Sequence, residues 1–182
     1  IKTSTFILDN ESYDFPTLFL STAPANFFDY FTGMYVMGPN ASSDFPHFGA
    51  NFWEDWEKPV YIEILEPDGT YFESPAGAKI FGGWSRGQEQ KSLSIFARGE
   101  YGSQEFDYPL FPNLDIDSYQ SFVLRNSGND WSFTMLRDGY ITGIFKDIDL
   151  DLQAYRPFLV YLNGEFWGLH NMREKVNEHF IA

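Results

Sequence analysis

Hydrophobic and polar residues alternate most clearly in the middle of the chain. Val60, Ile62 and Ile64 recur at every second position, which is the spacing of a strand with one buried face. The next residues, EPDG at 66–69, form a turn sequence in which Pro has the required φ and Gly tolerates a positive φ. Further short apolar runs follow. The pattern predicts an antiparallel β meander over residues 59–98.

The hydrophobic period becomes that of a helix after residue 129. Asn129 or Asp130 can cap the start of this helix, and an acidic residue suits the positive end of the helix dipole. Gly139 and Gly143 weaken the helix interior, although each would let another element approach closely. We expect one main helix here. Its apolar residues at helical spacing are Phe133, Leu136, Tyr140, Ile141, Ile144, Phe145 and Ile148.

The last apolar runs of the chain predict a β-hairpin. Residues 158–162 and 166–169 flank Asn163-Gly164, which is the strongest two-residue turn signal for a hairpin. Residues 174–181 then begin a second helical pattern. The whole order predicts an α+β fold with an antiparallel β meander, one main helix and a C-terminal β-hairpin.

No repeat, low-complexity tract or linker divides the chain. We therefore treat residues 1–182 as a single unit. Residues 1–50 are expected to be an irregular leading segment with a short strand at 17–21, and residues 51–182 hold most of the regular elements.

Charge and composition exclude several classes of function. A formal charge of −14 makes nucleic acid and anionic membrane poor partners. The sequence has no Cys and only three His, so neither a thiolate site nor a zinc site is expected. Its apolar runs are too short for a membrane span. Asp147, Asp149 and Asp151 resemble half of a calcium loop but lack its glycine and distant glutamate, so a solvated acidic turn is expected.

A glycine-rich stretch gathers cations in this acidic chain. In GGWSRG at 82–87, Gly83 and Gly87 can present backbone N–H groups to an anion, and Ser85 and Arg86 add side-chain donors. Lys91 follows at the start of the next strand. The alternative is a tight hairpin turn with solvated charges, since this spacing is not that of a Walker loop.

The order of elements is similar to the small lobe of a protein-kinase-like fold: glycine loop, lysine strand, lobe helix, two strands and hinge. Several runs also resemble the spore-coat protein H (CotH) kinase family over roughly residues 50–182, as its N-terminal portion. These runs are WEKPVYIEILEPDG (56–69), the stretch at 82–93, FVLRNSGNDW (122–131), LRD (136–138) and QAYRPFLVYLNGEFWGLHNMREKVNEHFI (153–181).

The resemblance implies an atypical, secreted bacterial kinase. Such a protein transfers the γ-phosphoryl group of ATP, with Mg or Mn, to Ser or Thr of extracellular or spore-coat proteins. The family's metal-binding and proton-accepting aspartates lie downstream of the hinge, and the sequence has no such motif. The resemblance therefore implies the nucleotide-facing lobe of a larger domain, inactive by itself, that contacts a C-terminal lobe. We expect an exposed apolar patch near residues 158–181 for that contact.

The resemblance also suggests roles for individual residues. Lys91 would reach the nucleotide phosphates, and Arg125 could face the same pocket, although satisfying turn carbonyls is the simpler role for it. Asp138 could pair with Lys91, as the lobe-helix acid does in ordinary kinases, or with adjacent Arg137. Met172 belongs to the hinge at 170–174, which would offer mainly backbone groups to adenine. No catalytic residue and no metal ligand is assigned.

A non-catalytic function is the alternative. Aromatic residues make up 20% of the chain, and exposed ones could stack on sugar rings, although aromatics in alternating strands usually belong to the core. This hypothesis is a β-rich carbohydrate- or protein-binding module of the bacterial cell surface. The tryptophans concerned are Trp53, Trp56, Trp84, Trp131 and Trp167.

Overall fold

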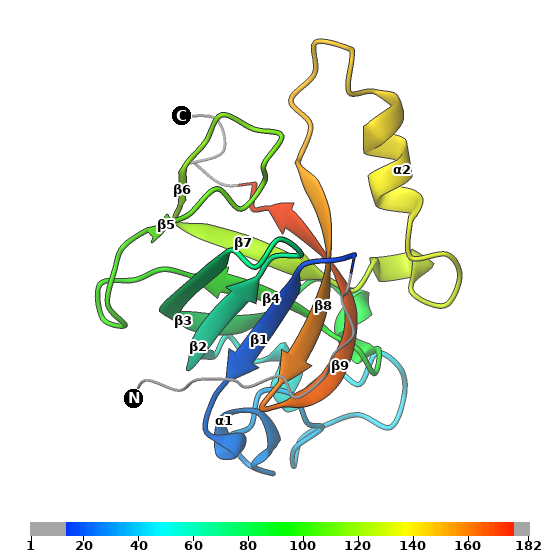
Figure 1. Ribbon diagram of the computed structural model, residues 1–182. Helices are drawn as coiled ribbons and strands as arrows, with labels where there is room; N and C mark the ends of the chain where they lie inside the picture. The colour runs from blue at the N-terminus through cyan, green and yellow to red at the C-terminus, as the bar shows by residue number, and fades with distance from the viewer. Residues whose placement is uncertain (1–13, 177–182) are drawn as a thin grey trace.

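The computed structural model describes residues 14–176, and within them seven strands form one closed barrel (Figure 1). The strand order around the barrel is β1-β2-β3-β4-β7-β9-β8. The barrel strands are β1 (Thr17–Ser21), β2 (Glu57–Leu65), β3 (Tyr71–Phe81), β4 (Ser92–Phe96), β7 (Ser121–Arg125), β8 (Tyr155–Leu162) and β9 (Glu165–Glu174).

The remaining elements are short. A separate two-stranded sheet pairs β5 (Phe106–Asp107) with β6 (Ser118–Tyr119). The α-helices are α1 (Pro24–Phe28) and α2 (Arg137–Ile144), and the 3-10 turns are η1 (Asn51–Trp53), η2 (Trp84–Gly87) and η3 (Gly128–Asp130). Among the described residues, no helix has the length and apolar character needed to cross a membrane.

The expected meander and both expected hairpin turns are present. Strands β2, β3 and β4 pair antiparallel in sequence order. Gly69 has φ +88° in the turn between β2 and β3. Between β8 and β9, Asn163 and Gly164 have φ values of 51° and 87°, the left-handed conformation that a two-residue hairpin turn requires.

Strand β1 closes the barrel. It is the short strand expected at residues 17–21. It pairs antiparallel with β2, where Leu18 faces Ile64, and parallel with β8, where Leu18 faces Val160. The connection between β1 and β8 spans most of the chain, so this pairing leaves no local pattern in the sequence.

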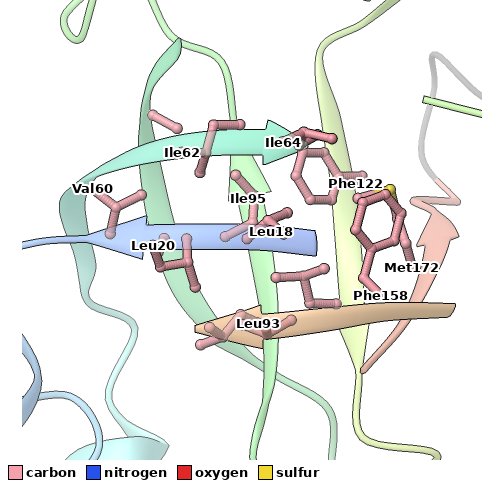
Figure 2. Close-up of a cluster of buried hydrophobic side chains, with 14 of the residues drawn as sticks. Leu18, Leu20, Val60, Ile62, Ile64, Leu93, Ile95, Phe122, Phe158 and Met172 are labelled. Carbon is pink, nitrogen blue, oxygen red and sulfur yellow. The ribbon is translucent and has the colours of Figure 1, made fainter. Parts of the chain in front are cut away.

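Alternate residues of every barrel strand point into a common apolar core, which Figure 2 shows as side chains directed toward one another. Small barrels fill their interior with side chains in this way. Because successive residues of a strand face opposite sides, the residues between the core positions lie on the outer face. The core side chains in Figure 2 include Leu18, Leu20, Val60, Ile62, Ile64, Leu93, Ile95, Phe122, Phe158 and Met172.

The prediction of an α+β fold that resembles a protein-kinase small lobe and is built around a main helix is wrong. The structure is mostly β and closed into a barrel, and α2 has only eight residues, none of them buried. Two of the apolar residues at helical spacing, Phe133 before α2 and Tyr140 within it, are 74% and 71% exposed. Helical spacing alone therefore did not indicate burial. Gly139 does allow a close approach, because a Cβ there would lie 2.6 Å from the Tyr155 ring on β8.

Exposed apolar side chains gather around α2, and the patch expected near residues 158–181 can be followed only as far as residue 176. Figure 1 shows α2 and the loop to β8 projecting from one side of the barrel. Phe158 and Val160, by contrast, are buried in the barrel, although Phe166 and Val176 are exposed. Of the second helix expected over residues 174–181, Glu174 belongs to β9 and residues beyond 176 lie outside the described part of the chain.

Replacing a core ring should cost far more stability than replacing an exposed one on the same sheet. Phe158→Ala removes a fully buried side chain and should lower the free energy of unfolding by about 3–5 kcal/mol, because it leaves a cavity. Phe166→Ala, at a position that is 59% exposed, is the matched control. Urea denaturation followed by circular dichroism measures both. Equal losses in the two variants would contradict the barrel register.

Candidate functional site

Polar residues line the outer face of β7 and β9, beside α2. Leu124 and Met172 point into the core, so Arg125, Asn171 and Arg173 lie on the opposite face. The strand register places Arg125 opposite Asn171. The sheet therefore brings together two arginines that are far apart in the sequence.

Asp138 of α2 interacts with both arginines. Its Oδ2 lies 3.1 Å from Nε of Arg125 and 3.8 Å from Nη1 of Arg173. The Arg125 and Asp138 side chains are 35% and 38% exposed, whereas that of Arg173 is only 4% exposed. Burial lowers the pKa of Arg173, and the Asp138 charge partly opposes this shift. One carboxylate is thus shared by two guanidinium groups.

Several buried polar atoms of this face have no hydrogen-bond partner. Arg173 donates from Nη2 to the carbonyl of Gln153 at 3.2 Å, but its Nε and Nη1 make no hydrogen bond. The Ser94 hydroxyl on β4, Oδ1 of Asn171 and Oδ2 of Asp138 also make no hydrogen bond. Ser94 faces Val123, which faces Arg173, so these residues form one row across three strands. Buried polar atoms are normally hydrogen-bonded, so this concentration requires an explanation.

The loop before α2 holds Asp138 in place. Asp130 accepts hydrogen bonds from the Thr134 hydroxyl at 2.6 Å and from the N–H of Arg137, the first residue of α2, at 3.1 Å. These bonds, led by that from Thr134, lower the pKa of Asp130. Asn171 donates to the Ser127 hydroxyl and to the Met135 carbonyl, at 2.7 and 2.8 Å. The N-cap position of α2 is Leu136, not Asn129 or Asp130 as expected, and Asp130 instead reaches the first helical N–H from the preceding loop.

Lys91 lies buried at the end of the barrel. Its amine donates to the carbonyl of Gln88 at 2.7 Å and lies 4.1 Å from the ring centre of Phe52 and 5.2 Å from that of Tyr35. The residue is 5% exposed. Burial lowers the pKa of Lys91 to about 8. Asp138, which could have been its partner, instead pairs with Arg125 and Arg173.

Arg86 braces the glycine-rich turn. Its Nε donates to the carbonyl of Gly82 at 2.6 Å and its Nη1 to that of Phe52 at 3.1 Å. The guanidinium also lies over the Trp53 ring, 5.5 Å from its centre. Arg86 thus donates hydrogen bonds to backbone carbonyls of the protein, which is a structural role.

The other residues predicted to bind a cofactor lie in different places. The Ser85 carbonyl accepts a hydrogen bond from Nδ2 of Asn126 at 3.5 Å, which links this turn to the residue after Arg125. Gly83 has open space at its Cα, whereas a Cβ at Gly87 would lie 2.7 Å from the Phe45 ring. Met172 is fully buried in the core. Of the assigned set, Arg125 and Asp138 are brought together, and phosphate binding by Lys91 stays a prediction.

The sequence reasoning missed Arg173 and Ser94. Arg173 was considered only as part of a hinge that would act through its backbone. The available signal was strand alternation, because Met172 is apolar and its neighbours Asn171 and Arg173 are polar. Among the described residues, no group of three or more His, Cys, Asp or Glu could hold a metal ion.

Comparison with known families defines the class of this protein. A family model described as CotH kinase protein matches residues 78–182, which is more than half of the chain. The chain belongs to the CotH kinase protein family. The matched part includes Arg125, Asp138 and Arg173, but not β1 and β2. A search of curated proteins found no match.

Removing the buried charge of Lys91 should change how stability depends on pH. The folded protein holds this amine at a pKa of about 8, against an ordinary 10.5, so the folded state disfavours its protonated form. The penalty is full below pH 8 and disappears as pH rises toward 10.5. Lys91→Met should therefore be more stable than the wild type at pH 7, by about 1–3 kcal/mol, with the difference shrinking by pH 10.

Urea denaturation at pH 7 and at pH 10 measures this difference. Lys146→Met, at an exposed position, is the control and should show no such trend. A Lys91→Met variant whose stability relative to the wild type is independent of pH would show that the amine is not held in a desolvated site.

Proposed function

We propose that this chain is the nucleotide-facing part of an atypical protein kinase, which transfers the γ-phosphoryl group of ATP to Ser or Thr of a protein. Family membership supports a kinase in general terms. The observation that carries the finer proposal is the 3.1 Å ion pair between Arg125 on β7 and Asp138 on α2. Protein kinases use a strand lysine paired with a helix glutamate to hold nucleotide phosphates. Arg125 and Asp138 likewise pair a cation on a strand with a carboxylate on a helix.

Under this proposal Arg125 is the phosphate ligand and Asp138 orients it. A guanidinium remains charged at all physiological pH values and offers several donors in a fixed plane, which suits phosphate oxygens. At 35% exposure, the Arg125 side chain is accessible to a ligand. Asp138 restricts the orientation of Arg125, so less conformational entropy is lost when the nucleotide binds.

Mg or Mn would accompany the nucleotide and neutralise charge on its phosphates. We propose that the carboxylates that hold this ion, and the base that accepts the proton of the Ser or Thr hydroxyl, come from outside residues 14–176. A further lobe would supply them and contact this one. Exposed apolar residues around α2, including Tyr140, Ile144 and Ile148, support α2 as part of that contact surface.

The cellular setting of the proposal rests on the family alone. We propose a bacterial protein that is secreted or displayed at the cell surface, whose acceptors are extracellular or spore-coat proteins. With this assignment, residues 1–182 are treated as one unit, the N-terminal lobe of a larger CotH-like domain.

Arg125→Gln should weaken binding of ATP with Mg²⁺ by about 10- to 100-fold in the full-length protein, because one charged hydrogen bond contributes about 1.5–3 kcal/mol. Isothermal titration calorimetry measures the affinity. A thermal shift gives a second readout, since ATP at 100 times its dissociation constant should stabilise the wild type by about 2.7 kcal/mol.

Arg98→Gln provides a matched control, because it removes another partly exposed arginine, one that pairs with Glu57. It should bind ATP like the wild type. Transfer of labelled γ-phosphate to Ser or Thr by the full-length protein tests the reaction itself. Failure of transfer, or an Arg125→Gln variant that binds ATP normally, would refute the proposed function.

A second candidate function is supported by an aromatic surface beside the glycine-rich turn. Phe45, Phe48 and Trp84 are 49%, 54% and 63% exposed, and both phenylalanine rings lie 6.2 Å from that of Trp84. The Trp53 indole donates to the carbonyl of Pro46 at 3.0 Å and so holds the loop that carries both phenylalanines. Exposed rings held in this way could stack on sugar rings.

If this chain is a carbohydrate-binding module, Trp84→Ala should weaken its binding to neutral oligosaccharides at least tenfold. Affinity electrophoresis in polysaccharide-containing gels measures this. Tyr71→Ala, which removes an exposed ring on β3, serves as the control. Equal migration of the wild type with and without polysaccharide would remove this second function.

A further inference from the structure

We propose that Arg173 is a second phosphate-binding residue, which together with Arg125 forms a two-arginine site for the di- or triphosphate group of a nucleotide. This inference rests on the proposed kinase function and specifies how the site would distinguish a phosphate chain from a single phosphate. Arg173 lies in β9 on the same outer face as Arg125.

The unpartnered donors of Arg173 are the main evidence. Its side chain is 4% exposed, yet Nε and Nη1 make no hydrogen bond. A buried charged donor without a partner costs free energy, because it has lost its water and gained no acceptor in return. Phosphate oxygens are strong acceptors for guanidinium donors and would satisfy both nitrogens.

The neighbouring residues also favour an anion. The unpartnered hydroxyl of Ser94 lies in the same row and can donate to a phosphate oxygen. Oδ1 of Asn171 is an acceptor, so it takes no part in binding an anion. Two guanidinium groups share the single carboxylate of Asp138 on this face, which leaves them only partly neutralised.

The other groups near Arg173 do not supply the missing partners. Its guanidinium lies 5.8 Å from the ring centre of Tyr155. Glu174, the next residue in β9, faces the opposite side of the strand and accepts a hydrogen bond from the N–H of Ala154 at 2.7 Å. The carboxylate of Glu174 therefore does not accept a hydrogen bond from Nε or Nη1 of Arg173. The acceptor nearest to these donors is Oδ2 of Asp138, which also makes no hydrogen bond and lies 3.8 Å from Nη1.

The two contacts of Asp138 indicate how a phosphate chain would enter. The ion pair with Arg125 is the closer one, at 3.1 Å, and that with Arg173 is longer, at 3.8 Å, while Oδ2 of Asp138 hydrogen-bonds to neither arginine. An anion can therefore replace Asp138 at Arg173 while Asp138 keeps Arg125 oriented. Arg125, the more exposed of the two arginines, would meet the ligand first.

Binding of inorganic tripolyphosphate and of inorganic phosphate to the full-length protein tests this inference without relying on catalysis. The wild type should bind tripolyphosphate at least tenfold more tightly than phosphate. Arg173→Gln should lose at least tenfold of the tripolyphosphate affinity, and Arg173→Lys should lose less because it keeps the charge. Arg98→Gln, with its arginine outside the site, should bind tripolyphosphate like the wild type.

A measurement on the wild type covers the case in which Arg173→Gln does not fold. The Nε–H resonance of Arg173, assigned by its disappearance in Arg173→Lys, should shift on addition of tripolyphosphate. An unmoved resonance, variants that bind within twofold of the wild type, or no tripolyphosphate binding by the wild type would overturn the inference. Failure of the kinase function is distinct, because it appears as absent γ-phosphate transfer while tripolyphosphate binding persists.

Discussion

The shared carboxylate of Asp138 is the interaction on which the functional account of this structure depends. It joins α2, an exposed helix with no buried residues, to two strands of the barrel through Arg125 and Arg173. The arginines meet because β7 and β9 are neighbours in the sheet. The single charge of Asp138 balances only one of the two guanidinium charges, and we propose that the donors of Arg173 without a hydrogen bond bind phosphate.

Because side chains alternate along each strand, the residues that stabilise the barrel and the candidate site residues lie on opposite faces of the sheet. Inward-facing residues fill a continuous apolar core (Figure 2). The residues between them lie on the outer face, where Arg125, Asn171 and Arg173 are polar. Because β1 closes the barrel, every barrel strand pairs with a strand on each side. These pairings fix the positions of the residues on the outer face of β4, β7 and β9 relative to one another. A rigid sheet is a suitable support for a site that must place several donors around one anion.

Local patterns in the sequence were enough to predict the meander, the hairpin turns and β1, because alternation and turn residues act over a few positions. The closure of the barrel could not be predicted from local patterns, because β1 pairs with β8 and most of the sequence lies between these two strands. The prediction of a main helix was wrong because helical spacing does not show whether another element of the protein packs against the helix. Arg125 and Asp138 were both candidate residues, and the structure pairs them with each other rather than Asp138 with Lys91, whereas Arg173 was considered only as part of a hinge.

A structure of the full-length protein with ATP and Mg²⁺ tests the central claim most directly. The account predicts phosphate oxygens within hydrogen-bond distance of Arg125 and of Nε or Nη1 of Arg173, on the outer face of β7 and β9. Phosphates held instead by the glycine-rich turn at residues 82–87 and the amine of Lys91, with neither arginine in contact with them, would contradict it.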